Sequence, residues 1–118
     1  MAKKAIPTYY PEVGEHLYLR QRTGNMWVDE VKRPCTVIEV DKAHDIVTIQ
    51  ECELIFNGPR YYDTIADEIK ANPNGRTMQL RFADTKKYRE MWVERGRDLA
   101  DYPYVAVFGR WEHQPYLN

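Results

Sequence analysis

Cysteine and histidine are scarce in this sequence. The two cysteines, Cys35 and Cys52, do not form a CxxC motif, and His16, His44 and His113 are far apart along the chain. A disulfide framework or a structural zinc site uses more of these residues at closer spacing. We therefore expect both thiols to be reduced, on strands that could be neighbours. We expect neither a metal site nor a cofactor.

The sequence also lacks an excess of either charge and lacks a long apolar run. Its formal net charge is -1 over 118 residues. A protein that holds duplex nucleic acid mainly by counterion release needs a basic face, which this balance disfavours. No apolar run approaches the roughly 20 residues of a membrane-spanning helix, and the basic start at Lys3 and Lys4 precedes no signal-peptide core. The composition predicts one cytoplasmic domain over residues 1–118.

Known catalytic motifs are also absent from the sequence. The sequence contains no glycine-rich phosphate loop and no hydrolase elbow. Glu15 precedes His16 and Glu112 precedes His113, but adjacent residues of a strand point to opposite faces and form no acid–base couple. We therefore expect a protein that binds a ligand without transforming it.

Aromatic residues, by contrast, are plentiful: nine Tyr, three Trp and three Phe. Arginines stand beside several of them in the sequence. Flat rings stack on nucleobases and guanidinium groups bind phosphate, so this combination is typical of nucleotide-binding surfaces. It is equally typical of protein interfaces. The candidate ligand-binding residues are Arg22, Trp27, Arg60, Tyr61, Arg110 and Trp111.

Each of these rings also has a purely structural interpretation. Trp27 lies in a loop among basic residues, where it either faces a ligand or folds back to plug a barrel. Tyr61 either stacks on a base or covers the end of the barrel. Trp111 belongs to an aromatic tail that either packs on its own domain or contacts a second copy in a homodimer.

Apolar alternation predicts strands over much of the chain. Leu17 and Leu19 alternate with polar residues within residues 15–20, and the same holds for Met78, Leu80 and Phe82 within 77–82. Further strands are expected at residues 34–40, 46–56 and 104–108. The apolar phase changes within 46–56, which predicts a bulge or sharp bend there. The residues from 8 to 14 are expected to form an ordered lead-in.

Helical spacing predicts two short helices between these strands. Tyr62, Ile65 and Ile69 indicate one that begins at Asp63 or Thr64 and ends at the Asn72 turn. A second helix is expected over residues 85–95, with an apolar face of Tyr88, Met91 and Trp92. The predicted fold is mainly β (α+β): a small, SH3-like, partly open antiparallel β-barrel with two short helical insertions. A flatter α+β sheet is the alternative.

Much of the chain resembles a known group of proteins. The matching segments are YYPEVGEHLYLRQRTG (9–24), VKRPCTVIEV (31–40), YYDTIADEI (61–69), PNGRTMQL (73–80) and FGRWEHQPYLN (108–118). They resemble small accessory proteins encoded by phages and prophages of Gram-positive bacteria. Residues 83–103 share no pattern with that group. The group has no assigned catalytic residues, so the resemblance implies a setting, the cytoplasm of a bacterial host, and no functional residue.

Composition and resemblance together suggest an antagonist of host antiviral defence. The leading hypothesis is sequestration of a nucleotide-derived signal, with bases stacked on Trp27, Tyr61 or Trp111. One alternative is an inhibitor that binds a host defence protein such as a CRISPR effector nuclease. Two others are a phage structural or assembly protein and an RNA-binding barrel.

Overall fold

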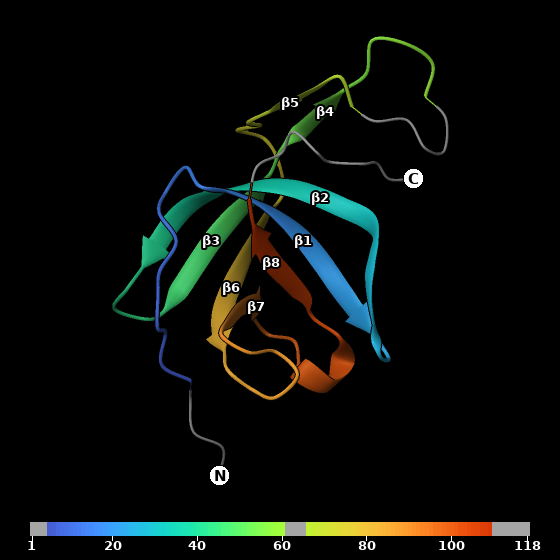
Figure 1. Ribbon diagram of the computed structural model, residues 1–118. Helices are drawn as coiled ribbons and strands as arrows, with labels where there is room; N and C mark the ends of the chain where they lie inside the picture. Colours follow the sequence, from blue (N-terminus) through green and yellow to red (C-terminus); the bar gives the residue numbers. More distant parts are fainter. Residues whose placement is uncertain (1–4, 61–65, 110–118) are drawn as a thin grey trace.

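The computed structural model describes residues 5–60 and 66–109, and of residues 28–32 it describes only the backbone. Strands dominate these residues (Figure 1). They are β1 (His16–Thr23), β2 (Met26–Asp41), β3 (Ile46–Glu51), β4 (Glu53–Ile55), β5 (Glu68–Lys70), β6 (Thr77–Ala83), β7 (Met91–Glu94) and β8 (Tyr104–Phe108), with a 3-10 turn η1 (Leu99–Asp101).

Six of the strands form a closed barrel in the order β1-β2-β3-β6-β7-β8. Every pairing is antiparallel, and β8 closes the barrel by pairing with β1 from Leu17↔Phe108 to Gln21↔Tyr104. The predicted antiparallel barrel is therefore confirmed, but the expectation that it is partly open is wrong. Closure pairs the backbone groups that β1 and β8 would otherwise expose as edge strands.

The interior of the barrel is filled by alternate residues of its strands, as a pleated strand requires. Leu17 and Leu19, predicted to point inward, are 0% and 1% exposed. Leu80 and Phe82 are also buried, and Met78 is partly buried against them. The other buried members of this core are Cys35, Val37, Val47, Ile49, Trp92 and Ala106.

A second apolar cluster covers the outside of the barrel wall. Val93 and Val105 are the partners that join β7 to β8, and both are fully buried. Their neighbours Trp92 and Ala106 belong to the interior core, so Val93 and Val105 point outward. Tyr88 and Ala83 complete this outer cluster.

The strands β4 and β5 form a separate two-stranded sheet, an arm that stands outside the barrel (Figure 1). The arm continues the β3–β6 hairpin beyond a break at Cys52. This break lies where the apolar phase changes. In place of the expected single strand with a bulge or sharp bend, residues 46–56 contain two strands, β3 and β4. Leu54 pairs with Ile69 across the arm.

Neither expected helical insertion is present in the described residues, where η1 is the one helical segment. The first predicted helix begins at Asp63 or Thr64 and ends at the Asn72 turn, and its start, up to residue 65, lies outside the described part. Its remainder is wrong, because Glu68–Lys70 is strand β5. Ile69 pairs with Leu54 across the arm. Its apolar character is therefore explained by strand pairing and not by the apolar face of a helix.

The second helix, predicted over residues 85–95, is a turn followed by strand β7. The Thr85 hydroxyl accepts a hydrogen bond from Tyr88 N at 3.0 Å, and Glu90 adopts a left-handed φ of 52° that leads into the strand. Tyr88 and Trp92 are both buried, but in different clusters on the two sides of the wall. The four-residue spacing of Tyr88 and Trp92 resembles that of a helix, but it arises because a turn separates them.

The lead-in from residue 8 to 14 is ordered, as expected, and its rings close one end of the barrel. The Tyr10 ring lies 5.9 Å from Trp92, and the Tyr9 ring 5.8 Å from Phe82. The Tyr10 hydroxyl bonds to Asp45, in the turn before β3. Tyr9 and Thr8 bond to Glu90, in the turn before β7. This plugged end is called the closed end below.

Candidate functional site

A cavity of about 470 Å³ lies at the other end of the barrel. Residues from all six barrel strands line it, so it is an axial mouth of the barrel. Glu51 and Glu94, the last residues of β3 and β7, belong to the lining, whereas the first residues of these strands adjoin the closed end. The floor is apolar and consists of Leu19, Cys35, Ile49 and Met78.

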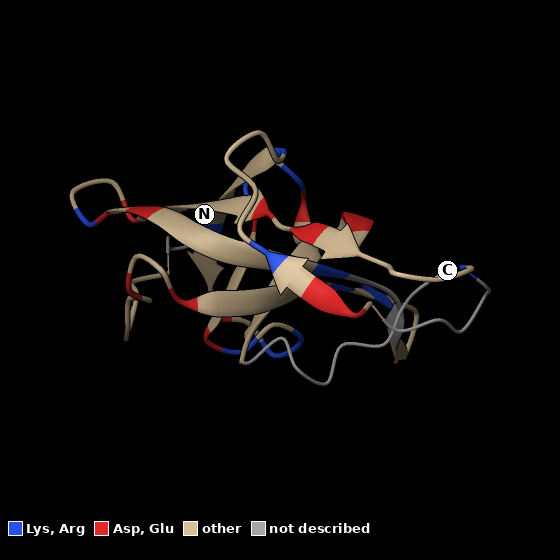
Figure 2. Cartoon of the chain, turned by 90° about the horizontal axis from the view of Figure 1, so that it is seen from above, with Lys and Arg blue, Asp and Glu red and all other residues tan. Residues whose placement is uncertain are grey.

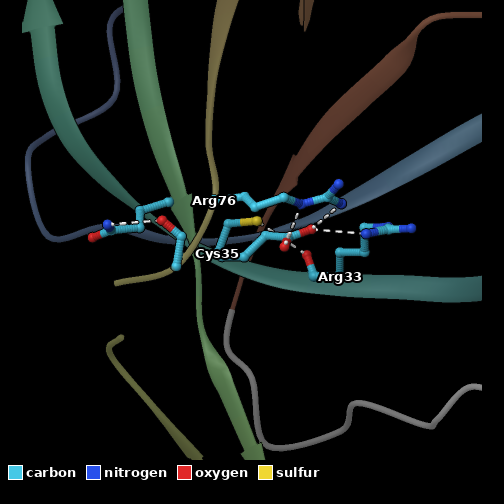
Figure 3. Close-up of polar contacts among 6 residues, drawn as sticks. Arg33, Cys35 and Arg76 are labelled. Atoms are coloured by element: carbon cyan, nitrogen blue, oxygen red, sulfur yellow. Dashed lines mark hydrogen bonds and ion pairs between the residues drawn. The ribbon is translucent and has the colours of Figure 1, made fainter. Parts of the chain in front are cut away.

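The rim of the cavity carries an ion-pair network centred on the Glu51 carboxylate. Arg33 Nη1 lies 2.9 Å from Glu51 Oε1. On the other side, Arg76 Nε lies 3.2 Å from Oε2 and Nη2 3.3 Å from Oε1. Figure 3 shows Arg33 and Arg76 extending toward the same place, with Cys35 beside them. Two guanidinium groups therefore share one carboxylate.

Arg76 is held at the rim by the turn before β6. Gly75 N donates to Asn72 O at 2.9 Å, and the Gln50 amide donates to the carbonyls of Pro73 and Gly75. A Cβ at Gly75 would lie 2.1 Å from the Glu51 carbonyl oxygen. Real Cβ atoms do not come so close, so only glycine lets the turn pack against the end of β3.

Tyr104 supplies an aromatic wall beside the same network. The Arg33 guanidinium carbon lies 5.8 Å from the centre of the Tyr104 ring, within the range of cation–π contact. Glu94 Oε1 accepts a hydrogen bond from Tyr104 N at 3.2 Å and pairs with Arg97 at 2.9 Å. Arg97 therefore neutralises Glu94, whereas Arg33 and Arg76 both pair with Glu51.

The network determines the charge of the rim at neutral pH. Partial burial raises the pKa of Glu51, but hydrogen bonds from Arg76 and Arg33 outweigh burial and hold that pKa below its ordinary value. The carboxylate is thus ionised. Burial, aided by the nearby Glu51 charge, raises the pKa of the Cys35 thiol on the floor. Cys35 stays protonated and is a poor nucleophile.

The two cysteines are free thiols, as expected, but they do not face each other. Cys35 points into the barrel, where it is fully buried. Cys52 Sγ lies 3.4 Å from the hydroxyl of Thr36, the neighbour of Cys35 that points to the other face of β2. The thiols therefore lie on opposite sides of the wall.

The predicted site residues Arg22 and Trp27 lie together, but away from the cavity. The Trp27 ring packs edge-on against Tyr88 at 6.3 Å, on the outer cluster. The guanidinium carbons of Arg20 and Arg22 lie 5.1 and 5.7 Å from the centre of the Trp27 ring. Trp27 is half-buried and does not plug the barrel.

The remaining predicted residues are not brought to either place. Arg60 is exposed at the end of the arm, with its guanidinium carbon 4.5 Å from the ring centre of Phe56. Tyr61, Arg110 and Trp111 lie outside the described residues. Among the side chains that the structure describes (residues 5–27, 33–60 and 66–109), there is no cluster of three metal-ligating groups.

The sequence reasoning missed the residues that surround the cavity. One signal could have found two of them. Arg33 has the same strand parity as Cys35, and Glu51 has the parity of Ile49, so each extends an inward-facing row with a charged residue. A charge on the inward face of a barrel strand marks a polar mouth or a ligand site.

The charges elsewhere do not gather into one large field. In the view of Figure 2, short stretches of basic and acidic residues are scattered over the strands and turns. This agrees with the net charge of -1. No helix in the described residues has the length and apolarity needed to span a membrane.

Comparison with models of protein families, with curated proteins and with solved structures found no match for this chain. The interpretation of the site therefore rests on its own residues.

Proposed function

We propose that the protein is a non-catalytic binding protein that holds a nucleotide-derived small molecule in the mouth of its barrel. The observation that carries this proposal is the pairing of Arg33 and Arg76 at the rim of a cavity with an apolar floor. Guanidinium groups bind phosphate oxygens in two-pronged fashion. The floor and the Tyr104 ring offer apolar surface for a base.

The size and chemistry of the cavity support the same proposal. Its volume of about 470 Å³ lies within the roughly 300–1,000 Å³ that is usual for small-molecule sites. The thiol of Cys35 on the floor is protonated because burial raises its pKa, and the described lining includes no histidine to activate it. Binding without chemistry fits this lining.

In the setting that the resemblance implies, such a protein sequesters a nucleotide signal in the bacterial cytoplasm and so antagonises host defence. The site of this proposal differs from the residues predicted from the sequence: Arg33, Arg76 and Tyr104 replace Arg22 and Trp27 as the binding group. The SH3-like character of the barrel and assembly into a homodimer stay predictions.

Isothermal titration calorimetry tests the proposal with a panel of nucleoside 5′-monophosphates and linear and cyclic dinucleotides. At least one should bind, and Arg33→Gln or Arg76→Gln should weaken it about 10-fold or more, since a hydrogen bond to a charged group contributes about 1.5–3 kcal/mol. Arg89→Gln is the matched control, because Arg89 is an exposed arginine in the turn beside the closed end.

Two results would reject the proposal. The first is absence of heat with every compound in the panel. The second is binding that Arg33→Gln and Arg76→Gln leave unchanged. Recovery of a tightly bound host protein from infected cells, in place of a nucleotide, would favour the alternative of an inhibitor that binds a defence protein.

A further inference from the structure

The rim of the cavity already contains an anion that belongs to the protein. Glu51 occupies the position between Arg33 and Arg76 that an anionic ligand would occupy. Its carboxylate is partly accessible, with the side chain 26% exposed, and so are the side chains of Arg33 at 34% and Arg76 at 75%. A ligand can therefore approach all three groups from solvent, and Glu51 competes with it.

The charge of this rim is not balanced. Two guanidinium groups share one carboxylate, and the nearby Glu94 is paired with Arg97. The rim thus retains one unmatched positive charge, which a ligand that carries more negative charge than the Glu51 carboxylate can match.

When a ligand displaces the Glu51 carboxylate from the two guanidinium groups, a ligand with more negative charge is favoured. A phosphodiester carries a single negative charge, so replacing the carboxylate with it leaves the electrostatic balance of the rim unchanged. A phosphate monoester carries about −1.5 to −2 charges at pH 7 and three acceptor oxygens. Such a group can match both guanidinium groups.

We infer that Glu51 sets a charge threshold at the barrel mouth, so that the site selects nucleotides with a terminal phosphate monoester over phosphodiesters such as cyclic nucleotides. This inference rests on the proposed function, because it concerns the ligand of the same cavity. The apolar floor of Leu19, Ile49 and Met78 and the Tyr104 ring contribute to the binding of the nucleoside part. Inorganic phosphate alone should therefore bind more weakly than a nucleotide.

Calorimetry on the wild-type protein provides the main test. For each base, the probes are the nucleoside 5′-monophosphate, its 5′-methyl ester and the 3′,5′-cyclic nucleotide. The monophosphate should bind at least about 10-fold more tightly than either diester, because a second charge-assisted contact is available only to the monoester. Inorganic phosphate is the probe without a nucleoside.

The Glu51→Gln variant tests the role assigned to the carboxylate. A neutral amide of the same shape no longer competes as an anion for the two guanidinium groups, so a monoanionic diester should gain about 10-fold in affinity. Glu53→Gln is the matched control, because Glu53 is an exposed glutamate in the adjoining strand β4. Thermal unfolding checks that both variants fold.

The outcomes separate this inference from the proposed function. Equal affinity of wild-type protein for the monophosphate and its methyl ester overturns the charge threshold, while the nucleotide site stands. Unchanged affinity of folded Glu51→Gln protein for the diesters overturns the role of Glu51. If no probe and no dinucleotide binds the wild-type protein or Glu51→Gln, the proposed function fails as well. The wild-type comparison decides whether the threshold exists even if the variant does not fold.

Discussion

The two ends of this barrel differ in how they use their side chains. At the closed end, the rings of Tyr9 and Tyr10 pack onto Phe82 and Trp92, and the hydroxyls of both tyrosines bond to neighbouring turns. At the open end, charged residues surround a cavity. Apolar rings that fill an interior stabilise the fold, whereas a hollow lined by charges gives up that stabilisation. The closed end therefore maintains the fold, and the open end is available for binding.

The largest effect on stability is expected at the closed end. Trp92 is fully buried and contacts the rings of Phe82 and Tyr10. Trp92→Ala should lower the free energy of unfolding by about 3–5 kcal/mol, because it removes buried surface and leaves a cavity. Urea denaturation followed by circular dichroism measures this. A loss below about 1 kcal/mol would contradict the assignment of the closed end as the stabilising region.

A smaller effect is expected from the turn at the open end. Gly75→Ala places a Cβ against the Glu51 carbonyl, so the turn must move away from β3 and carry Arg76 with it. Overpacking of this kind costs about 1–3 kcal/mol. The variant should also weaken nucleotide binding, which calorimetry measures. Gly58→Ala is the control, because a Cβ at Gly58 meets nothing within 4 Å. Equal effects of the two variants would show that the turn does not position Arg76.

The smallest effect is expected from the ion pairs of the rim themselves. Arg76 and Arg33 lower the pKa of Glu51 below its ordinary value of 4.5, against the opposing effect of burial. A lowered pKa in the folded state means that the ionised carboxylate stabilises the fold above pH 4.5, and that this contribution is lost as the pH falls through the lowered value.

Glu51→Gln protein should therefore show a flatter decline of stability below pH 4.5 than the wild type, with a difference at neutral pH of less than about 1 kcal/mol. Urea denaturation at a series of pH values measures both quantities. A neutral-pH loss as large as that of Trp92→Ala would remove the distinction between the two ends.

Local patterns were sufficient to predict the strands that alternate in polarity. Leu17 and Leu19 point inward as expected, and the phase change before Leu54 marks a real break at Cys52. These features depend on neighbouring residues and on the two-residue period of a strand. Closure of the barrel could not be predicted in this way, because it depends on β1 pairing with β8, at the far end of the described chain.

The wrong helix over residues 85–95 has a related cause. Tyr88 and Trp92 are four residues apart, which suits one face of a helix, but a turn separates them and they pack on opposite sides of a sheet. Burial on both sides of the wall makes Trp92 and Val93 consecutive core residues. A strand covered on both faces loses the alternation that would have identified it.

The candidate site was the least predictable part of the molecule. Arg33, Glu51 and Arg76 meet only because the register of β2, β3 and β6 brings them to one rim. The three residues are far apart in the linear sequence. Part of the aromatic excess, by contrast, is packing material, since the rings of Trp92 and Tyr88 are fully buried in the two apolar clusters. The proposed binding residues could be identified only from the register of the strands in three dimensions.

The arm of β4 and β5 is inserted between β3 and β6, which pair with each other from Ile46↔Arg81 to Gln50↔Thr77. The hydrogen bonding of the barrel is complete without it. Lengthening or shortening such an excursion costs little, since the entropy of closing a loop grows only slowly with its length. The length of the arm can therefore change while the barrel keeps its strand pairing and its shape.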